Sequence, residues 1–242
     1  MAQLGSACWL KNQTKPAPMS NKLILTSAFP EYWEEALCYL SQRDPVMSEL
    51  INRYRSVHFM PHESVLVSLL RAIVGQQISN KAAATLWERL SAEKVGCWES
   101  FVLATPSESL RAIGLNPRKI AAMKEVAWRW VDGRWSEAFF SSLTDDAVIR
   151  EVESIKGLGE WSAMSVLIFG LKRPDVLPLG DFGVRQALVN LYFPDENVVS
   201  VSRSGAQSRV KLVANVWAPY RTVATWFLWR SLENTPLEKE SE

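Results

Sequence analysis

Apolar residues recur at helical spacing through most of this 242-residue chain, and this periodicity most constrains its fold. The broadest apolar face lies between His62 and Gly75 and is formed by Val65, Leu66, Leu69, Leu70, Ile73 and Val74. A face this wide is typical of a helix at the centre of a bundle. Strand-like segments are short and isolated, at 23–26 and 197–201. We therefore predict an all-α fold, a two-lobed helical bundle with a cleft between the lobes.

Capping residues place the helix starts. Asp44-Pro45 predicts a helix to about Tyr54, and Ser79 or Asn80 predicts one through residues 82–90. Further helices are expected at 32–40, 62–75, 106–113, 118–131, 146–155, 161–171, 182–191 and 220–232, and a surface loop at 194–208. We predict a mobile tail at 1–22, a helical domain at 23–235 and an acidic tail at 236–242.

Composition limits the function classes. The 27 basic and 26 acidic residues give a formal net charge of +1, so any surface that binds nucleic acid must be local. Cys8, Cys38 and Cys97 are widely spaced, and His58 and His62 lie in no HExxH pattern, which argues against a disulfide framework or a zinc site. No uncharged stretch could span a bilayer and no secretory signal stands out, so we expect a cytoplasmic or nuclear protein.

A glycine-rich turn separates two predicted helices at Lys156-Gly157-Leu158-Gly159. Two glycines permit backbone angles that other residues resist, and the apolar residue between them can anchor the turn in the core. The amides left exposed at the start of the next helix suit a phosphate. An ordinary tight turn between packed helices explains the same four residues, and the pattern alone does not decide between the two.

Asp181 follows Gly180 and precedes a predicted helix, so it is expected to cap that helix. A carboxylate fixed in this way can also stabilise a developing positive charge. Taken by itself, the pattern favours a plain helix cap.

Four sequence blocks together resemble the helix-hairpin-helix glycosylase superfamily, and specifically its 3-methyladenine DNA glycosylase II branch. They are IKGLGEWSA at 155–163, DVLPLGDFGVR at 175–185, AIVGQQIS at 72–79 followed by Lys81-Ala82-Ala83, and WAPYR at 217–221 with Ala224 and Trp229. The blocks occur in the family's order and span roughly residues 32–232. Together they are far more specific than any one of them.

The resemblance implies that Asp181 is the catalytic carboxylate and that Asp175 braces its loop. It also implies that Lys156, Gly157, Gly159 and Trp161 lie against DNA phosphates. Branches with lyase activity carry lysine where this chain has Trp161. Because an indole cannot form a Schiff base, we expect a water nucleophile and no strand cleavage.

Trp161, Trp229 and Ser165 are the expected base-pocket residues. An electron-rich Trp229 ring would attract a cationic alkylated purine by about 0.5–2 kcal/mol. Some relatives have an aromatic residue where this chain has Ser165, which predicts a more open pocket. Gln77 stands at the family's wedge position, where a side chain fills the gap left by a flipped base.

The resemblance further implies an Na⁺ or K⁺ ion held by the main-chain carbonyls of Glu153, Ile155 and Leu158, with no cofactor required for catalysis. The expected partner is double-stranded DNA containing a damaged base, and the protein is expected to be a monomer. The implied activity is hydrolytic excision of alkylated purines in base excision repair, leaving an abasic site.

Three other hypotheses remain open from the sequence. The chain could be a non-catalytic DNA-binding module that uses the same hairpin, or a glycosylase for deaminated bases, for which Ser165 leaves room. A generic helical scaffold is the fourth reading, and it gives no reason for Trp161 and Asp181 to occupy matching contexts.

Overall fold

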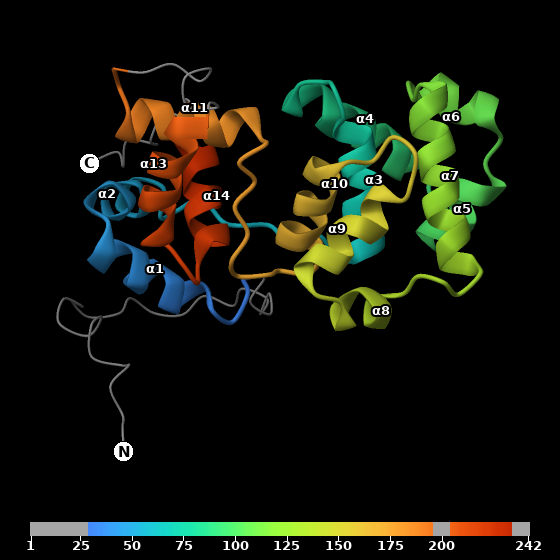
Figure 1. Cartoon of the computed structure of the whole chain (residues 1–242). Coiled ribbons are helices and arrows are strands. Elements are labelled where there is room, and N and C mark those ends of the chain that lie inside the picture. The colour runs from blue at the N-terminus through green and yellow to red at the C-terminus, as the bar shows by residue number, and fades with distance from the viewer. Residues whose placement is uncertain (1–28, 196–203, 234–242) are drawn as a thin grey trace, which may run out of the picture.

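The computed structural model describes residues 29–195 and 204–233, and these residues form helices and loops without strands. Figure 1 shows two groups of helices side by side. The first group contains both ends of the described chain: α1 (Trp33–Arg43), α2 (Pro45–Arg53), α11 (Phe182–Tyr192), α13 (Ser204–Asn215) and α14 (Arg221–Ser231). Within it, α14 contacts α1, α2 and α11. The predicted all-α class is confirmed.

The second group is built around α3 (Val65–Gly75), which contacts α4, α7, α8, α10 and η1. The other members are α4 (Asn80–Glu93), α5 (Trp98–Ala104), α6 (Ser107–Ile113), α7 (Pro117–Val131), α8 (Glu137–Ser142), α9 (Asp145–Glu153), α10 (Glu160–Ser165) and η1 (Val166–Gly170). From Val65 to Val74 only Arg71 is exposed, which confirms the broad apolar face. The Ser64 hydroxyl accepts from the Val67 amide, so α3 begins later than the predicted start at His62.

The two groups share one continuous apolar core. The Phe59 ring lies 5.3 Å from the Trp226 ring of α14 and 5.6 Å from the Phe169 ring of η1, between ring centroids. These aromatic contacts join the two groups at the point where the chain passes from one to the other.

The helix predicted at 161–171 changes type part-way along its length. It is α-helical to Ser165 and then forms the π-helix η1, in which the Leu171 amide donates to the Val166 carbonyl at 2.8 Å. Gly170 lets this turn approach α3 closely, because a Cβ there would lie 2.8 Å from Ser68 Oγ and 3.2 Å from Val65 Cα.

Three helices were not predicted: α5, α8 and α13. The prediction of a surface loop at 194–208 is wrong from Ser204 onward, because α13 begins there. The other predicted helices are confirmed to within a few residues. The strand-like segments at 23–26 and 197–201 and the tails at 1–22 and 236–242 lie outside the described residues, so the predicted domain boundaries stay a prediction. No helix of the described part has the length and hydropathy needed to cross a bilayer.

Candidate active site

Asp181 begins α11, as the sequence predicted. Its Oδ1 accepts the Val184 amide at 2.8 Å, which satisfies one of the free donors at the helix start. The preceding loop is fixed by the Arg185 guanidinium, which donates to the carbonyls of Leu179 at 2.8 Å and Gly180 at 2.7 Å. The backbone that carries the carboxylate is therefore held from both sides.

Two indole groups also bind the Asp181 carboxylate. Trp229 Nε1 of α14 donates to Oδ1 at 2.9 Å, and Trp161 Nε1 of α10 donates to Oδ2 at 3.1 Å. The two tryptophans come from different groups of helices, so the carboxylate lies where the groups meet. Asp181 is nevertheless partly exposed, and Trp161 is 43% exposed. The carboxylate is thus rigidly oriented and still reachable from solvent.

The start of the same loop is braced by an ion pair. Arg221 Nε and Nη2 each donate to an Asp175 carboxylate oxygen at 2.7 Å. Burial alone raises the pKa of Asp175, but the hydrogen bonds and charge of Arg221 outweigh it and hold the pKa below its usual value. Asp175 therefore stays ionised and anchors the loop to α14, as expected of a structural residue.

An aromatic stack backs Trp229. The Phe169 ring lies 5.9 Å from the Trp229 ring at an interplanar angle of 11°, and the His62 ring stacks on Phe169 at 5.0 Å. Burial, with a contribution from Arg71, lowers the pKa of His62 to about 4, so this stack is uncharged at neutral pH. Ser165, the last residue of α10, is partly buried.

The hairpin, residues 154–159 between α9 and α10, has the predicted form. Leu158 is 6% exposed and anchors the turn, while Lys156, Gly157 and Gly159 are exposed. Gly157 has a φ of +97°, in the left-handed range that favours glycine. Gly159 caps α10, so the first amides of that helix follow directly on the exposed turn.

The glutamine loop, residues 76–79, is tied to the hairpin. Gln76 Nε2 donates to the Gly157 carbonyl at 2.9 Å, and a Cβ at Gly75 would lie 4.0 Å from the Trp161 ring. Gln77 is exposed and has a φ of +58°, which is uncommon for a residue with a side chain. The loop thus presents Gln77 to solvent from a backbone anchored beside the hairpin.

Comparison with known proteins finds DNA glycosylases that are similar to this chain. No protein-family model matches the chain. DNA-3-methyladenine glycosylase 1 of Schizosaccharomyces pombe is 27% identical over 191 residues, which cover 76% of this chain and 79% of that protein. The DNA-3-methyladenine glycosylase of Saccharomyces cerevisiae is 26% identical over 198 residues, covering 69% of this chain and 67% of that protein.

Comparison with solved structures also finds 3-methyladenine DNA glycosylases. The S. pombe 3-methyladenine DNA glycosylase Mag1 in complex with abasic DNA matches with a TM-score of 0.67 and 25% identity, covering 81% of this chain and 96% of that chain. The relatives and solved structures together support placing the chain in the helix-hairpin-helix glycosylase superfamily. A 3-methyladenine DNA glycosylase of Archaeoglobus fulgidus, at 24% identity and a TM-score of 0.66, shares the superfamily fold over 82% of this chain and 69% of its own.

The cation site expected from the superfamily falls on the hairpin turn. Of its three predicted carbonyls, that of Ile155 accepts the Leu158 amide at 3.0 Å, so an ion there would share this oxygen with the turn. Among the described residues, no cluster of three or more His, Cys, Asp or Glu side chains could hold a metal ion. The main-chain site at Glu153, Ile155 and Leu158 stays a prediction.

Three residues that support the site were not predicted. Arg185 fixes the loop before Asp181 and Gln76 joins two loops, as described above. The third is Lys119, which is 7% exposed and donates through Nζ to the Val74 carbonyl at 2.8 Å, near the end of α3. Their partners are the main-chain carbonyls of distant or irregular segments. Every residue has such a carbonyl, so the sequence contains no signal for these contacts.

Proposed function

We propose that this protein is a monofunctional DNA glycosylase of the 3-methyladenine glycosylase II branch. It flips alkylated purines of the 3-methyladenine and 7-methylguanine type out of duplex DNA and excises them hydrolytically, leaving an abasic site. The observation that carries the proposal is the Asp181 carboxylate, held by Trp161, Trp229 and the start of α11 yet open to solvent. The relatives named as 3-methyladenine glycosylases support the substrate class.

The reaction breaks the bond between the sugar C1′ and the base nitrogen. The electron pair leaves with the base, positive charge develops on the sugar, and water adds at C1′ with loss of a proton. A preoriented carboxylate stabilises the cationic sugar and orients the water, and it needs no reorganisation during the reaction. In our proposal Asp181 has this role, since its three N–H donors fix both oxygens.

The lesion itself supplies part of the driving force. A purine alkylated at N3 or N7 carries positive charge, which weakens its glycosidic bond and attracts it to an aromatic face. Trp229 and Trp161 are the proposed aromatic contacts. The Phe169 ring behind Trp229 keeps that indole in one orientation. Ser165 lies one turn after Trp161 and leaves more room than an aromatic side chain.

We infer hydrolysis without strand cleavage from the residue at position 161. A lyase of this superfamily needs an amine at that position to attack the sugar. Here an indole occupies the position, and its N–H is already bonded to Asp181. Gln77 is proposed to fill the gap left by the flipped base, and the exposed glycines of the hairpin to bind DNA phosphates through their amides.

A base-release assay tests the proposal. Duplex DNA methylated at purines is incubated with the protein, and free bases are identified by chromatography, with Asp181→Asn as the control. We expect release of 3-methyladenine and 7-methylguanine, abasic sites without nicks, and no covalent adduct after borohydride treatment. Release by the variant at the wild-type rate would contradict the catalytic role of Asp181. Borohydride trapping of an adduct would contradict the water nucleophile, and release of deaminated bases alone would contradict the substrate class.

A further inference from the structure

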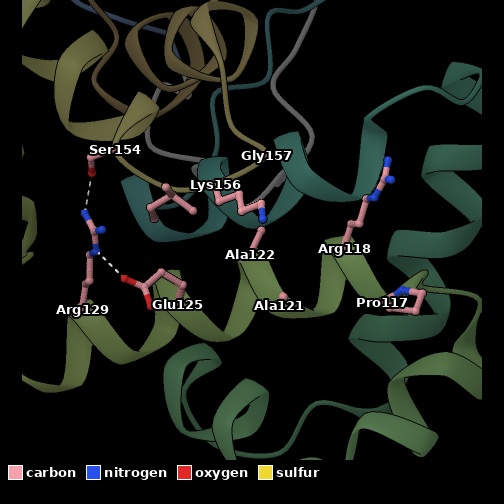
Figure 2. Close-up of a pocket in the computed structure, with 10 residues that line it drawn as sticks. Pro117, Arg118, Ala121, Ala122, Glu125, Arg129, Ser154, Lys156 and Gly157 are labelled. Carbon is pink, nitrogen blue, oxygen red and sulfur yellow. Dashed lines mark hydrogen bonds and ion pairs between the residues drawn. The ribbon is translucent and has the colours of Figure 1, made fainter.

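A groove of about 810 Å³ runs between the hairpin and α7. Figure 2 shows its lining: Lys156 and Gly157 come from the hairpin, while Pro117, Arg118 and the small residues Ala121 and Ala122 come from α7. No residue of α11 lines the groove, and in the view of Figure 1 α7 and α11 lie on opposite sides of α10. The groove therefore begins at the exposed turn proposed to bind DNA.

The groove is locally basic. Lys156 and Arg118 are exposed, and neither forms an ion pair in the part of the chain that the structure describes. Farther along the groove, Arg129 donates to Glu125 at 2.9 Å and to Ser154 at 2.6 Å. The charges of Arg129 and Glu125 therefore neutralise each other. Three basic side chains against one acidic one leave the groove two positive charges, whereas the whole chain carries a net charge of only +1.

A second hollow of the same volume provides an internal comparison. It also measures about 810 Å³ and is lined by residues of α4, α5 and α6, with Thr105 between them, but it includes no part of the hairpin. Its only charged lining residues are Arg89 and Glu93, whose charges cancel. Size alone therefore does not distinguish the two hollows; positive charge and continuity with the hairpin do.

We propose that the hairpin groove holds the sugar-phosphate backbone of the DNA beyond the phosphates bound by the hairpin residues, Lys156 included, with Arg118 of α7 as the additional phosphate contact. This inference rests on the proposed function. The small side chains of Ala121 and Ala122 leave room for a deoxyribose, and Arg118 and Lys156 supply unpaired positive charge for phosphates. The groove thereby provides the local basic surface that a nearly neutral chain needs in order to bind DNA.

The salt dependence of DNA binding tests this site. A duplex containing a tetrahydrofuran abasic analogue is titrated with wild-type protein, Arg118→Gln and the matched control Arg89→Gln at several salt concentrations. Each phosphate contact contributes about 0.9 to the slope of log K against log salt. We expect Arg118→Gln to lower that slope by about 0.9 and to weaken binding severalfold at low salt. Arg89→Gln should keep the wild-type slope.

Duplex length gives a second readout. The duplex is shortened on one side of the abasic analogue and then on the other, and we expect one of the two truncations to abolish the difference between wild type and Arg118→Gln. An unchanged slope in Arg118→Gln, or equal changes in both variants, would overturn the groove site. Wild-type protein that neither binds this duplex nor releases methylated bases would instead overturn the proposed function.

Discussion

Two aspartates begin helices in this protein with nearly the same hydrogen-bond chemistry, yet one is sealed and the other is open. Asp44 caps α2 and is 6% exposed, whereas Asp181 caps α11 and is partly exposed. Each side chain accepts from at least one main-chain amide and from at least one indole N–H. Because the donors are so similar, access to solvent is the property that separates the two carboxylates.

The sealed carboxylate holds elements together. Asp44 Oδ1 accepts the Val46 amide at 2.9 Å, and Oδ2 accepts the Tyr192 hydroxyl and Trp217 Nε1, each at 2.7 Å. Burial raises the pKa of Tyr192 and the Asp44 charge raises it further, so the phenol remains a donor. Asp44 thus joins α2 to the end of α11 and to Trp217, and no side of it is left for a substrate.

The open carboxylate differs in what surrounds it. Trp161, which donates to Asp181, is 43% exposed, and the neighbouring residue Phe182 is 63% exposed. A capped and indole-bound carboxylate therefore serves packing when it is sealed and stays accessible to a ligand when it is open. Four experiments test this distinction and are given in order of decreasing effect.

Asp181→Asn should lower the excision rate about 1000-fold or more, because the amide cannot stabilise a cationic sugar. The free energy of unfolding should change by less than about 1 kcal/mol, since asparagine is an equally good helix cap. Single-turnover base release and urea denaturation measure the two effects. A rate within tenfold of wild type would place Asp181 with Asp44 as a structural residue.

Asp44→Ala should lower the free energy of unfolding by about 3 kcal/mol. The substitution removes a helix cap and leaves the buried donors of Tyr192 and Trp217 without an acceptor. Urea denaturation followed by circular dichroism measures this loss, and excision is assayed below the unfolding transition. A stable Asp44→Ala protein that no longer excises bases would show that the sealed carboxylate also takes part in function.

A matched pair of substitutions removes one indole donor from each carboxylate. Trp217→Phe should cost about 2 kcal/mol of stability, because Trp217 is fully buried and its deletion leaves Asp44 underbonded. Trp161→Phe should cost less than about 1 kcal/mol of stability but lower the excision rate about tenfold, because Asp181 Oδ2 loses its donor. Denaturation curves and excision rates of both variants test the pair, and the opposite assignment of effects would refute the distinction.

Gln76→Leu tests whether the open site depends on its neighbouring loop. Loss of the bond to the Gly157 carbonyl should slow excision about fivefold, since one hydrogen bond contributes about 1 kcal/mol. If the bond serves base flipping, the defect should shrink when the lesion lies opposite an abasic position, where flipping costs less. Excision rates on paired and unpaired lesions measure this, and an equal defect on both would assign Gln76 to folding alone.

Local signals explain why much of the fold could be predicted. Asp44-Pro45 and Gly180-Asp181 each begin a helix through contacts within three residues, and the sequence contains all that is needed to recognise them. By contrast, α5 and α8 have seven and six residues, and no glycine marks their ends as Gly114 marks the end of the equally short α6. The sequence at 161–171 predicts one continuous helix, because α and π turns bury similar apolar side chains and the sequence pattern does not distinguish them.

The contacts within the site cannot be predicted from short-range sequence patterns. Trp161 and Trp229 were expected in the base pocket, but their bonds to Asp181 connect residues 20 and 48 positions apart. No periodicity encodes such a contact, since it depends on how two groups of helices pack. The predicted roles of Gln77, Ser165 and the hairpin phosphate contacts concern DNA and stay predictions.

The π turn after α10 links two parts of the molecule through a single length of chain. A π turn holds one more residue than an α turn, so every side chain beyond it is rotated by about 100° relative to a continuous α-helix. Trp161, before the turn, reaches Asp181, and Phe169, within it, reaches Trp229. Deleting one residue between 166 and 170 would swing Phe169 off its partner ring, so the length of this segment matters as much as its composition.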